Sequence, residues 1–244
     1  MLPAEYRTMH EVELSHWWFR GRRRVLLDLL RQAMASEGDL LRVLDYGCGT
    51  GGNTQAYGAL ATVIGVEVDR AAIKLAQQRG GALYCCANGT QLPFGSGSFD
   101  LVVASDVLEH VENDIAAASE IARVLKPGGV AIVTVPAHQW LFSEHDVALL
   151  HFRRYSKVAL RNLLQRSGFT IRRLSYWNML LFPAIALHRL IKKPRALHPV
   201  HSDTRPASWM VNEALSLLLT AEAAIVRRMP LPWGVSLLTV AERL

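Results

Sequence analysis

The most constraining feature of this sequence lies at residues 43–52, where an apolar run is followed by an acid and then by closely spaced glycines. Asp45 follows Val43 and Leu44, and glycine stands at positions 47, 49, 51 and 52. Glycine lets a ligand approach the backbone closely, and a helix that opens after such a turn presents free N–H groups to an anion. We therefore expect a strand, a ligand-binding turn and a helix from Asn53 onward.

The glycine spacing fits two classes of ligand. Gly47, Gly49 and Gly52 match the G-x-G-x-x-G pattern of dinucleotide-binding proteins. Asp45, Gly47, Gly49 and Gly51 match the D-x-G-x-G-x-G pattern of S-adenosylmethionine-dependent methyltransferases. A plain strand-to-helix turn can also carry such glycines, so the rest of the chain has to decide.

Strand-like and helical segments alternate along the chain after this turn. Apolar strand patterns cover residues 40–44, 62–67, 82–86, 99–105, 130–135, 169–174 and 235–241. Such alternation predicts an α/β fold, with a mostly parallel sheet covered by helices on both faces. In 244 residues we expect a single domain made of a helical cap (1–36), a core (40–176), a helical insertion (177–230) and a closing strand (231–244).

An acid ends the second predicted strand. Glu67 lies 18 residues after Gly49, close to the interval of about 20 residues at which an acid accepts hydrogen bonds from ribose hydroxyls. Because both residues follow parallel strands, the spacing predicts that Glu67 binds the ribose of a nucleoside whose other end lies on the glycine turn.

Residues 137–156 interrupt the alternation and are rich in reactive side chains. The segment contains His138, Trp140, Glu144, His145, Asp146, His151, Arg153, Arg154 and Tyr155. Long connections in compact domains are usually functional, and α/β sheets bind ligands beyond the carboxyl ends of their strands. We therefore expect a substrate loop here.

The net charge and the number of cysteines limit the kinds of binding partner and the cellular compartment that can be expected. The net charge is +6 and the isoelectric point is near 9.5, which would suit RNA, an anionic membrane or an acidic substrate. Three cysteines form neither a disulfide framework nor a C-x-x-C pair. No signal-peptide pattern precedes Trp17, so a cytoplasmic location is expected.

Two apolar helical stretches are predicted at 179–191 and 208–228. The second contains Glu213 and Glu222, which argue against a membrane span, and its polar residues share one side, as in a helix packed at the protein surface. The first runs into Lys192, Lys193 and Arg195. An apolar helix followed by basic residues predicts peripheral membrane contact through residues 179–195. The alternative is that this helix forms a lid over the site or a dimer surface.

The succession of motifs resembles the class I S-adenosylmethionine-dependent methyltransferases, in particular their small-molecule, type 11-like bacterial branch. The resemblance rests on residues 43–51, 63–67, 88–94, 99–111 and 125–130, the last reading L-K-P-G-G-V. It implies a Rossmann-like, seven-stranded sheet with an antiparallel last strand, and S-adenosylmethionine as cofactor. It also implies methyl transfer, here expected at an oxygen of a small, lipid-linked or glycan-linked acceptor.

The resemblance also assigns the cofactor residues. The turn from Asp45 through Gly47, Cys48, Gly49 and Gly51 would hold the methionine part, and Glu67 the ribose. Val68 would lie against the adenine, Asn88 with Gly89 at its amino edge, and Ser105 with Asp106 at the transferring end. Position 88 is usually Asp in this family, and Asn lacks the charge. Trp18 is predicted to close over the sulfonium cation, although the aromatic patch around it is also typical of a core staple.

Methyl transfer from a sulfonium mainly requires alignment of the acceptor, but a hydroxyl acceptor also has to lose a proton. His151 and His110 are the candidate bases, and Arg154 with Tyr155 are candidates for holding an anionic acceptor. Quinone-pathway O-methyltransferases hold a divalent metal with an acid, acid, His cluster at a place similar to Asp106, Glu109 and His110. The first acid is shorter here, and we expect no metal.

Two other functions remain open from the sequence. The basic isoelectric point would suit a nucleic-acid methyltransferase, although no RNA-binding module or Asn-Pro-Pro-Tyr-type motif is visible. A noncatalytic protein that binds S-adenosylmethionine is the third hypothesis. The sequence predicts no particular oligomeric state.

Overall fold

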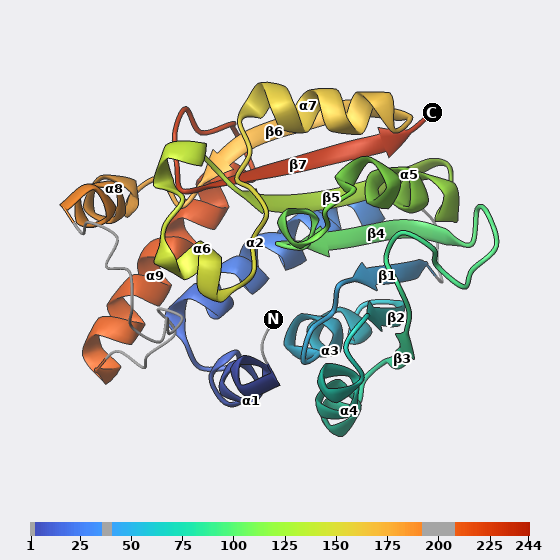
Figure 1. The fold of residues 1–244 in the computed structure, drawn as a ribbon, viewed down its shortest axis with the longest axis horizontal. Coiled ribbons are helices and arrows are strands. Elements are labelled where there is room, and N and C mark those ends of the chain that lie inside the picture. The colour runs from blue at the N-terminus through green and yellow to red at the C-terminus, as the bar shows by residue number, and fades with distance from the viewer. Residues whose placement is uncertain (1–2, 36–40, 192–207) are drawn as a thin grey trace.

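In the computed structural model the strands form one seven-stranded sheet (Figure 1), and the structure describes residues 3–35, 41–191 and 208–244. The strands are β1 (Arg42–Tyr46), β2 (Thr62–Glu67), β3 (Leu83–Cys86), β4 (Phe99–Ser105), β5 (Leu125–Pro136), β6 (Phe169–Trp177) and β7 (Ser236–Arg243). Their order is β3-β2-β1-β4-β5-β7-β6. Strands β1 to β5 pair in parallel, and β7 is antiparallel to both β5 and β6. The predicted α/β fold with an antiparallel last strand is confirmed.

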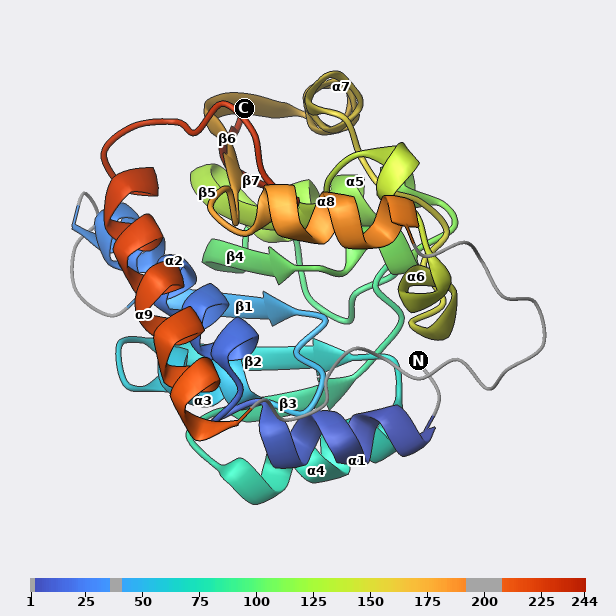
Figure 2. The same cartoon turned by 90° about the vertical axis from the view of Figure 1, so that its left-hand side faces the viewer.

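Helices cover both faces of this sheet (Figure 2). The helices are α1 (Pro3–Val12), α2 (Trp17–Met34), α3 (Gly52–Gly58), α4 (Arg70–Arg79), α5 (Asp114–Val124), α6 (Glu144–Ala148), α7 (Lys157–Arg166), α8 (Phe182–Ile191) and α9 (Trp209–Val226). One core contains Ile121 of α5 and Leu160 of α7, and the other contains Leu26 of α2, Tyr57 of α3 and Leu219 of α9. Apolar burial on both faces explains why β1 and β4 are nearly continuous apolar runs.

Strand β1 lies at the point where the chain changes its direction of progress across the sheet. It pairs with β2 on one side and with β4 on the other. In open α/β sheets this arrangement leaves a crevice beyond the carboxyl ends of the strands, and ligands bind there. The glycine turn after Tyr46 and the acid Glu67 at the end of β2 both lie at this edge.

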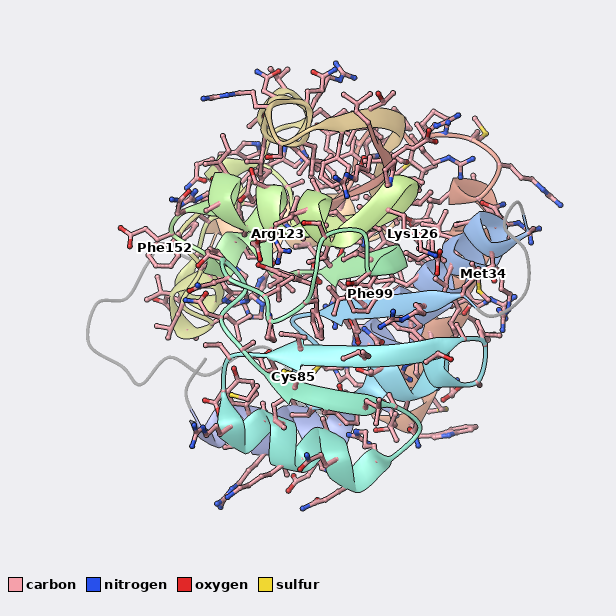
Figure 3. All side chains as sticks on the ribbon, turned by 90° about the vertical axis from the view of Figure 1, so that its right-hand side faces the viewer. Met34, Cys85, Phe99, Arg123, Lys126 and Phe152 are labelled. Carbon is pink, nitrogen blue, oxygen red and sulfur yellow. The ribbon has the colours of Figure 1, made fainter. Side chains whose placement is uncertain are left out.

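The loop before β4 is fixed by aromatic and guanidinium contacts. Phe99 at the start of β4 meets the ring of Phe94 edge-on, with centroids 5.0 Å apart. Arg123, at the end of α5, donates to the carbonyls of Phe94 and Leu92 at 2.8 and 3.2 Å. Figure 3 labels Phe99 and Arg123 on this side of the molecule, above Cys85 on the outer strand β3. These contacts hold residues 88–94 next to the crevice.

The amino-terminal segment, predicted as a helical cap, is not one continuous helix. Two helices form, because the side chain of His16 accepts a hydrogen bond from the amide of Trp18 at 3.3 Å and so caps a new helix at Trp17. The preceding helix α1 extends back to Pro3. Similarly, residues 108–124 form a 3-10 turn (Leu108–His110) followed by a separate helix, α5.

Helix α9 packs on the protein through a face of mixed character. Leu219, Ala223 and Val226 are buried there beside Ser216. The buried Glu222 accepts hydrogen bonds from the amide of Met179, and Glu213 pairs with Arg20 of α2. Other apolar residues, such as Leu217, face outward. Among the described residues, α9 is the one helix long and apolar enough to cross a membrane by length and composition, and its packing on α2 accounts for part of that character.

Candidate active site

A cavity of about 1320 Å³ lies at the carboxyl ends of β1, β2 and β4. Its walls also include residues of α1, α2, α8 and α9, so segments from both ends of the chain enclose it. All predicted site residues except Gly51 and Tyr155 line this cavity. The structure therefore brings the two halves of the predicted site, the nucleoside-binding half and the reacting half, into one space.

The glycine turn has the backbone that its sequence predicts. Gly47, Gly49 and Gly51 adopt φ angles of 75°, 54° and 85°, a region that favours glycine. The amides of Gly47 and Cys48 both donate to the carbonyl of Val66, at 2.8 and 2.9 Å, which ties the turn to the end of β2. A Cβ atom on Gly47 would lie 2.4 Å from the side chain of Val107, so only glycine fits at that position.

The carboxylate of Glu67 accepts hydrogen bonds both from the glycine turn and from the residues just before α4. Its Oε2 accepts from the amide of Gly49 at 3.2 Å, and its Oε1 accepts from the amides of Val68 and Asp69 at 2.8 and 3.3 Å. Burial raises the pKa of Glu67, although these backbone hydrogen bonds oppose the shift. The carboxylate is therefore held in one orientation at the place where a ribose diol was predicted.

Asp45 lies beneath the turn and is buried. The hydroxyl of Thr54 donates to its Oδ2 at 2.6 Å. Burial raises the pKa of Asp45 to about 7, and the hydrogen bond from Thr54 opposes this shift. Asp45 thus joins β1 to α3 from below and stands close to the cavity.

Helix α1 covers the glycine turn, which the sequence did not indicate. A Cβ atom on Gly49 would lie 2.9 Å from the terminal methyl of Met9. Glu13, just after α1, accepts a hydrogen bond from the hydroxyl of Thr50 and pairs with Arg79 at 2.8 Å. The sequence missed Met9 and Glu13 because both act over long sequence separations.

The residues predicted to bind adenine lie in a more exposed part of the cavity than the glycine turn. Val68 is 65% exposed. The side-chain oxygen of Asn88 accepts from the amide and the hydroxyl of Thr90, both at 3.0 Å. A Cβ atom on Gly89 would lie 2.2 Å from the hydroxyl oxygen of the buried Tyr46, so glycine is required there. Trp18 lines the cavity and also stacks on Trp177, with ring centroids 5.3 Å apart.

Ser105 and Asp106 lie at the end of β4. The hydroxyls of Ser105 and Thr134 are 3.1 Å apart, and Thr134 donates to Asp106 Oδ1 at 3.0 Å. The other oxygen of Asp106 pairs with Arg22 of α2. Asp106 has a φ of 54°, a strained conformation for a residue with a side chain. Its carboxylate is therefore held by partners on the sheet and on α2.

Asp146 organises the substrate loop. It is fully buried and accepts from Ser143, from His151 Nδ1 at 2.9 Å and from two nitrogens of Arg154 at 2.8 and 3.0 Å. Burial alone would raise the pKa of Asp146, but the hydrogen bond from His151 and the charge of Arg154 outweigh it and lower the pKa. Asp146 belongs to the predicted substrate loop, but its sequence context indicates no role for it.

Two of the candidate reacting residues have their polar atoms engaged by the protein. Arg154 also donates to the carbonyl of Ala137 at 3.2 Å. The hydroxyl of Tyr155 donates to Asp114 at 2.8 Å, and the ring is buried away from the cavity. These contacts favour structural roles for both residues over the predicted binding of an anionic acceptor.

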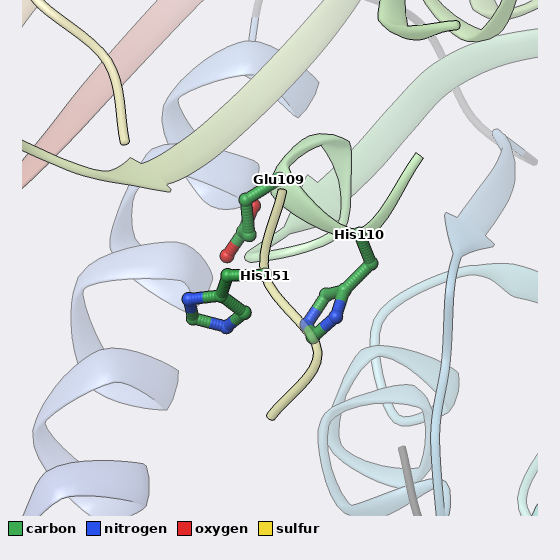
Figure 4. Close-up of side chains that lie close together, drawn as sticks. All are labelled: Glu109, His110 and His151. Carbon is green, nitrogen blue, oxygen red and sulfur yellow. The ribbon is translucent and has the colours of Figure 1, made fainter. Parts of the chain in front are cut away.

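The two candidate bases meet at one corner of the cavity together with a buried acid. Figure 4 shows His151 and His110 beside Glu109, and the centroids of the two rings are 4.6 Å apart. Burial and the neighbouring His151 lower the pKa of His110 to about 4, so His110 is neutral at physiological pH. Burial, reinforced by Asp106, raises the pKa of Glu109. The corner thus offers imidazole nitrogens and carboxyl oxygens in a water-poor setting.

Proteins of known family resemble this chain in sequence. Residues 44–133 match the family model described as a methyltransferase domain. The chain is 31% identical over 169 residues to a probable S-adenosylmethionine-dependent methyltransferase of Mycolicibacterium smegmatis, covering 68% of this chain and 64% of the relative. It is 35% identical over 130 residues to an uncharacterized methyltransferase of Mycolicibacterium vanbaalenii, covering 51% of each chain. The chain spans about half the length of several such curated relatives.

A solved structure supports the same assignment of fold. An S-adenosylmethionine-dependent methyltransferase from Mesorhizobium loti aligns with a TM-score of 0.57 and 18% sequence identity, covering 87% of this chain and 96% of that one. At this identity the likeness concerns the fold alone. The glycine turn, β2, β4 and the carboxyl end of β1 fall within the residues that match the family model.

Proposed function

Because this chain carries the domain of the class I S-adenosylmethionine-dependent methyltransferases, we propose that it transfers the methyl group of S-adenosylmethionine to an oxygen of a small or lipid-linked acceptor. The observation that carries the proposal is the single cavity that joins the glycine turn and Glu67 to the Glu109–His110–His151 corner. A donor and an acceptor can lie end to end in such a space.

The residues present fit this cofactor. The turn at Gly47 and Gly49 has no side chains to block a ligand, and Glu67 presents a fixed carboxylate one strand away. S-adenosylmethionine supplies an electrophilic methyl group on a sulfonium. Asn88 lacks the charge usual at its position, and its side-chain oxygen is shared with Thr90, so recognition of the adenine amino edge would rest on backbone groups around Gly89.

In the proposed reaction the acceptor oxygen forms a bond to the methyl carbon while the carbon–sulfur bond breaks. The bonding electron pair stays on sulfur, which becomes a neutral thioether, and the acceptor hydroxyl loses its proton. The protein contributes alignment and the exclusion of bulk water. His110 and His151 remain the candidate proton acceptors, because both line the corner of the cavity where the acceptor would lie.

The apolar part of the cavity wall supports an acceptor with an apolar portion. Leu181, Ile185 of α8 and Leu215 of α9 line the cavity, and α8 continues into the exposed side chains of Leu190 and Ile191. The basic residues predicted to continue this surface, at positions 192, 193 and 195, lie outside the described residues. We include peripheral contact with the cytoplasmic face of the inner membrane in the proposal.

The cofactor assignment is tested by calorimetry with S-adenosylmethionine and with NAD. We expect binding of the first and none of the second, and the reverse result would refute the proposal. Incubating a cell extract with enzyme and cofactor labelled in the methyl group then identifies the acceptor. Recovery of label only in RNA would favour the nucleic-acid alternative.

Sedimentation with liposomes containing anionic lipid tests the membrane contact. Wild type should pellet more than the Lys192→Ala, Lys193→Ala, Arg195→Ala triple variant. Equal pelleting of the two proteins would remove the electrostatic part of the proposal.

A further inference from the structure

The carboxyl group of Glu109 accepts no hydrogen bond from any other residue that the structure describes. Its residue is fully buried in the 3-10 turn after β4, and neither of its two oxygens has a partner among the described residues. Burying a polar group without a partner costs about 1–3 kcal/mol or more, and native proteins usually satisfy such groups. Asp146, equally buried nearby, has several partners. The bare carboxyl group therefore indicates a missing ligand.

Two imidazoles surround this carboxyl group. One ligand atom each from Glu109, His110 and His151 lie within 4.8 Å of one another. The two rings meet nearly at right angles, at 82°, so neither stacks over the other (Figure 4). Glu109 and His110 come from the turn after β4, whereas His151 comes from the loop after α6.

The imidazole of His151 is oriented by a hydrogen bond on one side. Nδ1 of His151 lies 2.9 Å from Oδ1 of Asp146 and donates a hydrogen bond to it, which leaves Nε2 as the nitrogen with a lone pair. The ring of His110 meets that of His151 edge-on. Leu150, which precedes His151, has a φ of 59°, a strained conformation. A histidine that ligates a metal usually makes such a second hydrogen bond, because it fixes the tautomer and the direction of the ring.

We propose that Glu109, His110 and His151 bind a divalent transition-metal ion such as Zn²⁺. Two imidazoles and one carboxylate form a ligand set that suits Zn²⁺ or Fe²⁺, whereas Mg²⁺ prefers oxygen ligands alone. This set differs from the Asp106, Glu109 and His110 cluster weighed from the sequence, because Asp106 is engaged by Thr134 and Arg22.

Three protein ligands leave at least one coordination position on such an ion, and the cavity lies next to it. An acceptor hydroxyl bound there would become more acidic, so the ion would replace a histidine base. His110 and His151 would then serve as ligands. This role in transfer rests on the proposed function, but binding of the ion does not.

The experiment uses the full chain, stripped with a chelator and then titrated with Co²⁺ as a spectroscopic probe. We expect one Co²⁺ per chain, visible d–d absorption, and a dissociation constant of about 10 µM or tighter. Glu109→Gln and His151→Gln should each weaken binding by about 100-fold or more. Binding weaker than about 1 mM by folded wild type, or unchanged binding by these variants, would overturn the proposal.

His138→Asn is the matched control. His138 lies outside the cluster, where its ring stacks on Tyr176 and its Nε2 contacts the carbonyl of Gly234 at 3.1 Å. Its φ of 63° is one that Asn tolerates. The control should keep wild-type binding of Co²⁺, and equal loss in this variant would count against the assigned ligands. His110→Gln supplies a further test if Glu109→Gln does not fold.

The affinity of the wild-type chain for S-adenosylhomocysteine separates the two proposals. If wild type binds S-adenosylhomocysteine but not Co²⁺, the metal site is overturned and the proposed function stands. If wild type binds Co²⁺ but not S-adenosylhomocysteine, the metal site stands and the proposed function is overturned.

Discussion

Glu67→Gln should weaken the binding of S-adenosylhomocysteine through the loss of one acceptor and one charge. In the structure one carboxylate oxygen of Glu67 accepts hydrogen bonds from the amides of Val68 and Asp69, and the other accepts from the amide of Gly49. Glutamine has a single acceptor oxygen, so its NH₂ group would face either the amide of Gly49 or the amides of Val68 and Asp69. Losing a hydrogen bond to a charged group costs about 1.5–3 kcal/mol, which corresponds to about a 10- to 150-fold higher Kd.

Calorimetry with S-adenosylhomocysteine at pH 7.5 measures this change. Glu11→Gln is the control, because it removes the same charge from an exposed position that does not line the cavity. A thermal unfolding scan of each variant separates lost affinity from lost folding. A Kd for Glu67→Gln within about threefold of the control would refute the assignment of Glu67 to the cofactor.

The pH dependence of the same affinity gives an independent check. Because the pKa of Glu67 is raised, its carboxylate is protonated at a higher pH than an ordinary glutamate. Wild-type affinity should therefore fall as the pH is lowered through this raised pKa. Glu67→Gln has no such group and should lack this part of the pH dependence.

Three further substitutions test the packing around the site. Asp45→Asn should remove one part of the pH dependence of stability. The folded pKa of Asp45, about 7, exceeds the ordinary 3.8, so Asp45 makes the free energy of unfolding of wild type fall by up to about 4 kcal/mol as the pH rises from 4 to 7. In urea titrations at several pH values the variant should lack this decrease, and an unchanged pH profile would contradict the shifted pKa. Asp146→Asn should lower the free energy of unfolding by about 3–5 kcal/mol, because the buried Arg154 loses its counter-ion, and a loss below 1 kcal/mol in guanidinium titrations would contradict this. Gly89→Ala should cost about 1–3 kcal/mol by the same titrations, because its methyl group would overlap the hydroxyl of Tyr46; wild-type stability would show that the ring can move.

The sequence predicted the cofactor half of the site because that half is local. A strand, a glycine turn and an acid at the end of the next strand occur within 25 residues, and parallel pairing brings Gly49 and Glu67 together. The seven strands were also predictable, since apolar runs and turn residues are local properties. Strand ends moved by a few residues, as in β5, which starts at Leu125 rather than Val130.

The acceptor half was less predictable because it depends on contacts between distant segments. His110 and His151 could be nominated by residue type, but the burial of Glu109 depends on a loop 40 residues later. The position of α1 over the glycine turn also depends on residues far apart in the sequence, because Glu13 forms an ion pair with Arg79. The partners of the acidic residues of α9 were not predictable for the same reason, because Arg20 and Met179 lie far along the chain from Glu213 and Glu222.

Strand β7 occupies an interior position in the sheet although it is the last strand in the sequence, between β5 and β6. During synthesis, residues 125–177 emerge well before β7, so β5 and β6 have unpaired edges until residues 236–243 leave the ribosome. A premature stop before Ser236 would leave these edges open permanently. Nascent or truncated chains should therefore engage chaperones at this half of the sheet, while β1 to β4 can already pair.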